Sequence, residues 1–99
     1  MKWRVKEWLC ESYKAEKENC LKAYIYKSAL WAGFYLNGKP PCYDVRYKGQ
    51  TIARIYFKRK GAAVKGFAAA AAYPEISDLD LVEIAMWVNK LRFAGVQLN

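Results

Sequence analysis

Two alternating runs of residues, 42–48 and 51–58, constrain the fold of this chain more than any other feature. In both runs an apolar or aromatic side chain stands at every second position, with polar or charged side chains between. Successive side chains of a β-strand point to opposite faces of the sheet, so this pattern indicates two half-buried strands. Because only a short segment around Gly49 separates the runs, the sequence predicts a β-hairpin over 42–58.

The register of this hairpin depends on the length of its loop. A two-residue Gly49-Gln50 loop suits a type II′ turn but places Val45 opposite Arg54, which mixes apolar and charged side chains on one face. A three-residue loop from Gly49 to Thr51 leaves one face apolar throughout, with the pairs Tyr47–Ala53, Val45–Ile55 and Tyr43–Phe57. We expect the three-residue loop, because a slip of one residue moves every side chain to the other face.

The polar face of the expected hairpin holds the candidate binding residues, and the basic segment Lys58-Arg59-Lys60 extends them. Lysine and arginine contact phosphates, and an aromatic ring among them can stack on a base. Repulsion between Arg46 and Arg54 across the strands is better tolerated where an anion binds, although Asp44 also offsets it. The candidate residues are Arg46, Lys48, Arg54, Tyr56, Lys58, Arg59, Lys60 and Lys65.

The positive charge of the chain is concentrated in the same stretch. The 99 residues carry 17 Lys and Arg against nine Asp and Glu, a net charge of +8. Residues 39–65 hold eight of the basic side chains and a single acid, whereas residues 66–89 hold four acids and no base. A contiguous basic surface attracts polyanions by counterion release, whereas scattered lysines serve only to solvate the protein.

The segments before and after the hairpin have less regular patterns of apolar residues, and some of them fit more than one type of secondary structure. Residues 2–18 predict an amphipathic helix with a stripe formed by Val5, Trp8, Leu9 and Tyr13. In residues 20–36 the spacing of apolar side chains favours a helix, whereas the aromatic and β-branched content favours strands. We expect a helix over 20–29 and leave 30–37 open between the two. Residues 62–72 form either a third strand against a helix or a short alanine helix after Gly66.

The strongest helical pattern covers residues 77–94. Ser77 and Asp80 match the S-x-x-D capping box, an apolar stripe from Leu81 to Leu91 faces the core, and Gly95 is the expected end. We therefore expect an α+β fold of one domain, 1–99. It comprises an N-terminal helix or helix pair, an antiparallel sheet of two to four short strands, and this helix packed on one sheet face.

Most of the aromatic residues are expected in the core, with Trp8, Trp31, Phe57 and Trp87 first among them. The aromatic side chains expected to make exposed contacts are Tyr56, Tyr26 and Tyr43.

Several function classes lack the residues they need. The chain contains no histidine, and no serine or threonine has a partner base, so we expect no enzyme, no cofactor and no metal site. Cys10, Cys20 and Cys42 are odd in number and widely spaced, and no secretory signal precedes them, which favours free thiols in a cytoplasmic protein. No run of 18 apolar residues is present, so we expect no membrane span.

These observations favour a small basic accessory protein that binds DNA or RNA largely through phosphate contacts on the hairpin face. The alternative is a protein-interaction module, a small inhibitor or adaptor, that docks the same basic aromatic patch on an acidic partner protein. A third hypothesis is a homodimer in which the acidic closing helix of one copy meets the basic hairpin of another.

Overall fold

A computed structural model of the chain describes residues 3–9, 12–18, 21–28, 42–58 and 61–97, including their side chains except those of Leu9 and residues 93–97. One antiparallel sheet contains all six described strands, and each strand pairs with its neighbours in sequence. The strands are β1 (Trp3–Leu9), β2 (Ser12–Lys17), β3 (Leu21–Lys27), β4 (Cys42–Tyr47), β5 (Gln50–Lys58) and β6 (Gly61–Gly66). A 3₁₀-helix, η1 (Ala68–Ala72), and a long helix, α2 (Asp78–Gln97), complete the described structure.

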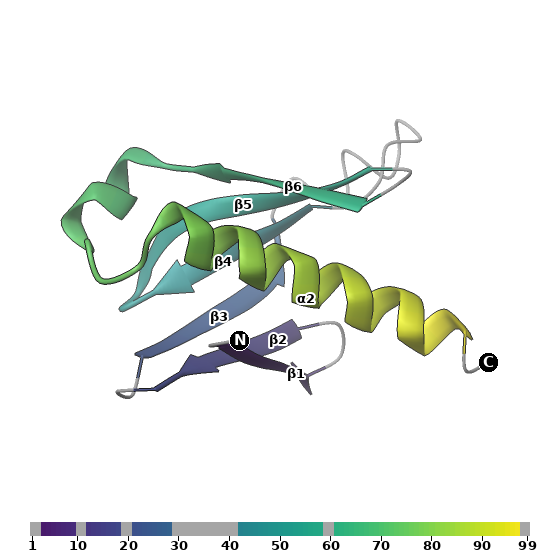
Figure 1. The fold of residues 1–99 in the computed structure, drawn as a ribbon. Helices are drawn as coiled ribbons and strands as arrows, with labels where there is room; N and C mark the ends of the chain where they lie inside the picture. Colours follow the sequence, from purple (N-terminus) through teal and green to yellow (C-terminus); the bar gives the residue numbers. More distant parts are fainter. Residues whose placement is uncertain (1–2, 10–11, 19–20, 29–41, 59–60, 98–99) are drawn as a thin grey trace.

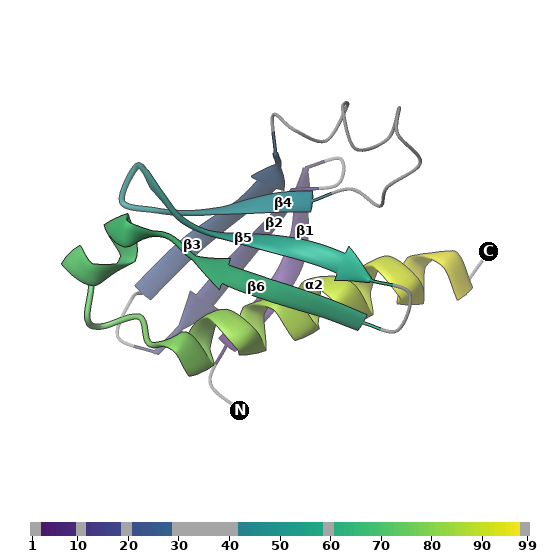
Figure 2. The same ribbon diagram turned by 90° about the horizontal axis from the view of Figure 1, so that it is seen from above.

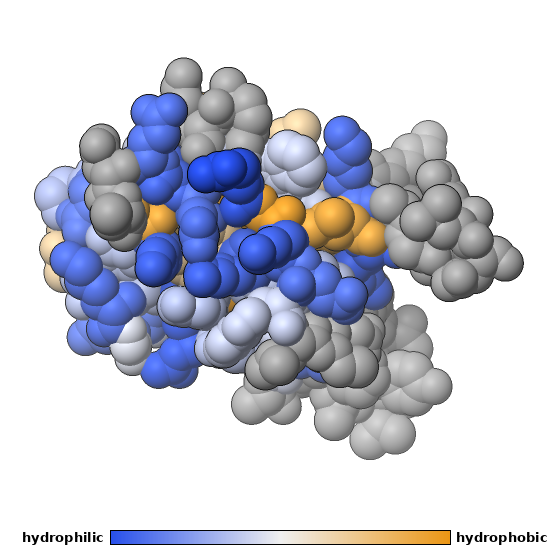
Figure 3. Space-filling view, turned by 90° about the horizontal axis from the view of Figure 1, so that it is seen from below, coloured by the Kyte–Doolittle hydropathy of each residue, from blue (hydrophilic) through white to orange (hydrophobic). Residues whose placement is uncertain are grey.

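Helix α2 lies across one face of the sheet, as two perpendicular views show (Figures 1 and 2). The core lies between this face and the helix. From the sheet it takes alternate residues such as Ile25, Val45 and Ile55, and from the helix Ile84 and Val88, all fully buried. The β1 side of the molecule, in contrast, is predominantly hydrophilic (Figure 3).

The expected N-terminal helices are wrong, and so is the expected limit of two to four strands. Residues 3–17 form β1 and β2, and residues 21–27 form β3. Their buried side chains alternate, with Trp3 and Val5 in β1 and Tyr13 and Ala15 in β2. The apolar residues of these segments fit the spacing of a helix as well as that of a strand. Whether so short a segment becomes a strand depends on pairing with neighbouring strands, which its own sequence does not show.

The hairpin over 42–58 is confirmed, but both expected registers are wrong. β4 and β5 are joined by a Lys48-Gly49 turn with φ angles of +50° and +81°, which a type I′ turn requires. Tyr47 pairs with Gln50, and a β-bulge then shifts the register so that Val45 pairs with Ala53. The bulge adds one residue to β5, and the apolar side chains therefore remain on one face.

The C-terminal helix and its capping box are confirmed. Asp80 N donates to Ser77 Oγ at 3.2 Å, and Ser77 N donates to Asp80 Oδ2 at 2.9 Å. The helix continues through Gly95 to Gln97, so the expected stop at Gly95 is wrong. A glycine inside a helix costs only about 1 kcal/mol. The solvent side of α2 exposes Leu79, Val82 and Met86.

Two further expectations concern the alanine-rich segment and the aromatic side chains. Both alternatives for residues 62–72 occur in succession, because strand β6 is followed by the alanine 3₁₀-helix η1. Trp8 is 43% exposed and not part of the core, and Tyr43 is fully buried and not an exposed contact. Trp31 lies outside the described residues.

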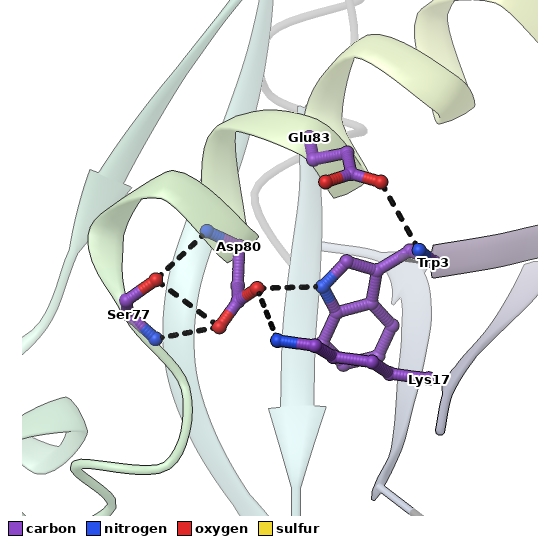
Figure 4. Close-up of polar contacts among 5 residues, drawn as sticks. All are labelled: Trp3, Lys17, Ser77, Asp80 and Glu83. Carbon is purple, nitrogen blue, oxygen red and sulfur yellow. Dashed lines mark hydrogen bonds and ion pairs between the residues drawn. The ribbon is translucent and has the colours of Figure 1, made fainter. Parts of the chain in front are cut away.

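A buried carboxylate connects the start of α2 to the first two strands (Figure 4). Asp80 Oδ1 accepts hydrogen bonds from Trp3 Nε1 at 2.9 Å and from Lys17 Nζ at 3.0 Å. Burial alone would raise the pKa of Asp80, but the bonds from Ser77, Trp3 and Lys17 outweigh it and lower the pKa to about 2. Glu83 holds the same strand, since it accepts a bond from Trp3 N at 3.0 Å.

We predict that Asp80→Asn lowers the free energy of unfolding at pH 7 by about 2 kcal/mol, as the depressed pKa implies. A carboxyl whose pKa is lower in the folded state stabilises the protein above its unfolded pKa, about 3.9. The difference between wild type and variant should therefore shrink as the pH falls from about 4 to about 2. Urea denaturation across this range measures it.

Asp78→Asn is the matched control, because Asp78 is exposed in the first turn of the same helix. Its free energy of unfolding should change by less than about 0.5 kcal/mol. Equal stability losses in the two variants, or a loss in Asp80→Asn that does not depend on pH, would contradict the assignment.

Candidate functional site

The face of the sheet opposite α2, called the outer face below, is the candidate site. No described element packs against it. Residues paired across adjacent antiparallel strands point to the same face, so the strand register defines which side chains the outer face carries. The alternation of buried inner residues in β1 to β5 gives the same assignment.

A row of outward side chains crosses four strands. Lys6 in β1 pairs with Lys14 in β2, Lys14 with Tyr24 in β3, and Tyr24 with Arg46 in β4. Adjacent strands are about 4.8 Å apart, so this central row spans about 14 Å of sheet. Two further rows flank it: the three residues Arg4–Glu16–Lys22 on one side, and the four residues Tyr26–Asp44–Arg54–Lys65 on the other.

The outer face is strongly cationic. Two acids, Glu16 and Asp44, stand among its described strand residues, which gives those residues a net charge of +6. The basic residues are Arg4, Lys6, Lys14, Lys22, Arg46, Arg54, Lys58 and Lys65.

Both acids of the outer face are engaged by neighbouring bases. Glu16 lies 2.9 Å from Lys14 Nζ, and this hydrogen bond and charge lower the pKa of Glu16 and raise that of Lys14. Asp44 Oδ1 accepts a bond from Arg54 Nε at 2.7 Å. Six bases have no ion-pair partner in the part of the chain that the structure describes: Arg4, Lys6, Lys22, Arg46, Lys58 and Lys65.

A basic pocket of about 370 Å³ opens at the β1–β2 end of this face. Arg4, Lys6, Lys14 and Glu16 line it together with Val5. Lys6 and Lys14 stand directly opposite each other across the two strands. Like charges in that position destabilise a sheet, and an anion held between them would relieve the repulsion. The pocket therefore suits a phosphate or carboxylate group.

An aromatic cluster of Trp8, Tyr24 and Tyr26 adjoins the central row. The ring centroid of Trp8 lies 5.1 Å from that of Tyr24 and 5.9 Å from that of Tyr26. The two tyrosine rings are 6.4 Å apart and nearly parallel, with 20° between their planes. Sequence reasoning missed Trp8 because it placed this residue on a helical stripe. Its alternation with Arg4 and Lys6 was the pattern that could have revealed it.

The residues predicted from the hairpin are only partly brought together. Arg46, Lys58 and Lys65 are exposed, whereas Arg54 and Tyr56 are half-buried. Arg54 is held by Asp44 and lies 5.1 Å from the centroid of the Phe67 ring. Arg46 braces the hairpin turn by donating to Gly49 O at 2.6 Å. Arg59 and Lys60 lie outside the described residues.

Lys48 does not belong to the outer face. It is exposed in the turn after β4, with its ammonium 3.6 Å from a carboxylate oxygen of Glu75. The same ammonium lies 5.4 Å from the ring centroid of Tyr47 and 5.9 Å from that of Tyr73. Tyr47 Oη also donates to Glu75 at 2.9 Å, so these side chains fasten the turn to the segment that precedes α2.

The thiol of Cys42 is buried and free, and burial raises its pKa despite the opposing hydrogen bond with Ser28. A protonated thiol is a poor nucleophile and a poor metal ligand. Cys10 and Cys20 lie outside the described residues. Within the described ranges, no three Cys, Asp or Glu side chains cluster closely enough to hold a metal ion.

Among the described residues, no helix combines the length and the hydrophobicity that crossing a bilayer requires. Comparisons of the chain with protein-family models, with curated proteins and with solved structures gave no match.

The placement of Trp8 on the outer face predicts its contribution to stability. Trp8→Ala should lower the free energy of unfolding by no more than about 1 kcal/mol, because the side chain is 43% exposed. Trp3→Ala should cost about 3–5 kcal/mol, because Trp3 is fully buried and bonded to Asp80. Urea denaturation of the two variants measures both, and comparable losses would contradict the placement of Trp8.

Proposed function

We propose that the protein is a non-enzymatic accessory protein that binds nucleic acid on its outer face, largely through phosphate contacts. The observation that carries this proposal is the charge of that face, with eight bases against two acids that are already engaged. Each phosphate neutralised by a lysine or arginine releases condensed counterions, and this release supplies most of the affinity of sequence-independent binding.

The arrangement of the bases supports contacts to a polymer of phosphates. The unpaired cations are distributed over β1, β3, β5 and β6, and Arg46 adds an exposed guanidinium in β4. Several phosphates in succession match such a surface better than one compact anion does. Binding should show little sequence preference, since a sheet face without a recognition helix does not enter the major groove to contact base edges.

An acidic partner protein is the competing occupant of the same face. Exposed ion pairs at the rim of a protein interface contribute mainly to association rate and little to affinity. A protein partner would have to desolvate the cations that surround the aromatic cluster, whereas phosphates neutralise these cations directly. The abundance of unpaired cations therefore favours nucleic acid as the ligand. Binding of an acidic protein instead would be detected in the same experiment.

We predict that Lys6→Gln and Lys22→Gln each weaken binding to a fluorescent 12-nucleotide oligonucleotide. In each variant the slope of log K against log salt concentration should become shallower by about 0.7 to 0.9, which corresponds to one lost phosphate contact. Fluorescence polarisation between about 50 and 200 mM salt measures the slope.

Lys90→Gln is the matched control, because it removes one exposed positive charge from α2, which packs on the other face of the sheet. Its slope should equal that of the wild type. A flat salt response in the wild type, or an equal effect of all three changes, would overturn the proposal. Saturable binding of an acidic polypeptide without binding of the oligonucleotide would favour the competing partner.

A further inference from the structure

The aromatic cluster of the outer face indicates which form of nucleic acid the face accepts. Trp8, Tyr24 and Tyr26 come from β1 and β3, on either side of β2, and their rings contact one another above the sheet. Large aromatic side chains are usually buried, yet Trp8 is 43% exposed. The exposed indole, with the two phenol rings in contact with it, presents an apolar surface to solvent.

The cluster stands among the cations that would hold phosphates. Tyr24 lies between Lys14 and Arg46 in the central row. Trp8 follows Lys6 by two residues in β1, a separation of about 6.6 Å in a regular strand, and lies where the pairing with β2 shifts register. A sugar-phosphate backbone that follows the row therefore brings its bases within reach of the rings.

Only one form of nucleic acid can contact the cations with its phosphates and the aromatic rings with its bases at the same time. In a duplex the base faces are stacked against one another, and the face of a six-stranded sheet reaches neither them nor the groove edges. A single strand exposes base faces, which stack on tryptophan and tyrosine in a sequence-tolerant manner. The pairing of aromatic rings with flanking cations is the combination by which other proteins bind single strands.

We infer that the outer face binds single-stranded nucleic acid, with a base stacked on Trp8 and phosphates on Lys6, Lys14 and Arg46. This inference rests on the proposed function and specifies its ligand. Tyr24 and Tyr26 act as positioning residues that hold the indole, and Tyr24, which stands in the central row, contacts a neighbouring base. The half-buried Tyr56, in contrast, lies outside the cluster.

The test compares a 12-nucleotide single strand with the duplex of the same sequence, using wild type, Trp8→Ala and Trp8→Phe in fluorescence polarisation. Wild type should prefer the single strand. Trp8→Ala should weaken single-strand binding by about 5- to 150-fold, the equivalent of one lost stacking contact. Its salt slope should not change, because every cation remains, and Trp8→Phe should restore most of the affinity.

Quenching of tryptophan fluorescence provides a second measurement that does not depend on the alanine variant folding. The single strand should quench wild-type emission, and Trp8→Phe should remove most of this quenching while retaining binding. Equal affinity for single strand and duplex, together with unchanged quenching in Trp8→Phe, would overturn the inference but leave the proposed function intact. Failure of both nucleic acids to bind would instead overturn the proposed function.

Discussion

The carboxylate of Asp80 is the interaction on which the arrangement of the molecule depends. A buried charge is tolerated only when donors surround it, and the donors to Asp80 come from the start of its own helix and from β1 and β2. These bonds fix the start of α2 over the N-terminal end of the sheet. Glu83, one turn later, accepts the amide of Trp3 and so occupies a hydrogen-bonding group at the β1 edge that would otherwise be open to another strand.

With α2 fixed on the inner face, no element among the described residues covers the outer face. Its composition follows from strand parity, since Val45 and Ile55 point inward while Arg46 and Arg54 point outward. The bulge in β5 preserves this parity after a two-residue turn that would otherwise disturb it. Stability and binding therefore use different sets of side chains, and outward residues can be changed with little effect on the core.

The sequence predicted those parts of the structure whose determinants are local. The alternation around Val45 and the capping box of Ser77 and Asp80 each lie within a few residues, and both the hairpin and α2 are correct. The N-terminal strands were missed because Val5 and Tyr13 also fit a helical stripe, and only pairing with other strands resolves the ambiguity. The hairpin register was missed because Lys48 adopts a positive φ, for which glycine or asparagine is the usual indication.

The candidate site was predicted incompletely for the same reason. Arg46, Arg54 and Lys58 were correctly assigned to the polar side of the hairpin, but Lys48 was not. The row that continues the polar side through Lys14 and Lys6 depends on strands that the sequence did not reveal. The binding role of the whole face is tested most directly by nuclear magnetic resonance, with a ¹⁵N-labelled protein titrated with a single-stranded oligonucleotide. If the outer face binds the oligonucleotide, the Trp8 indole and amides in β1 to β4 should shift, with α2 unperturbed. Shifts confined to α2, or none at saturating oligonucleotide, would contradict this binding role.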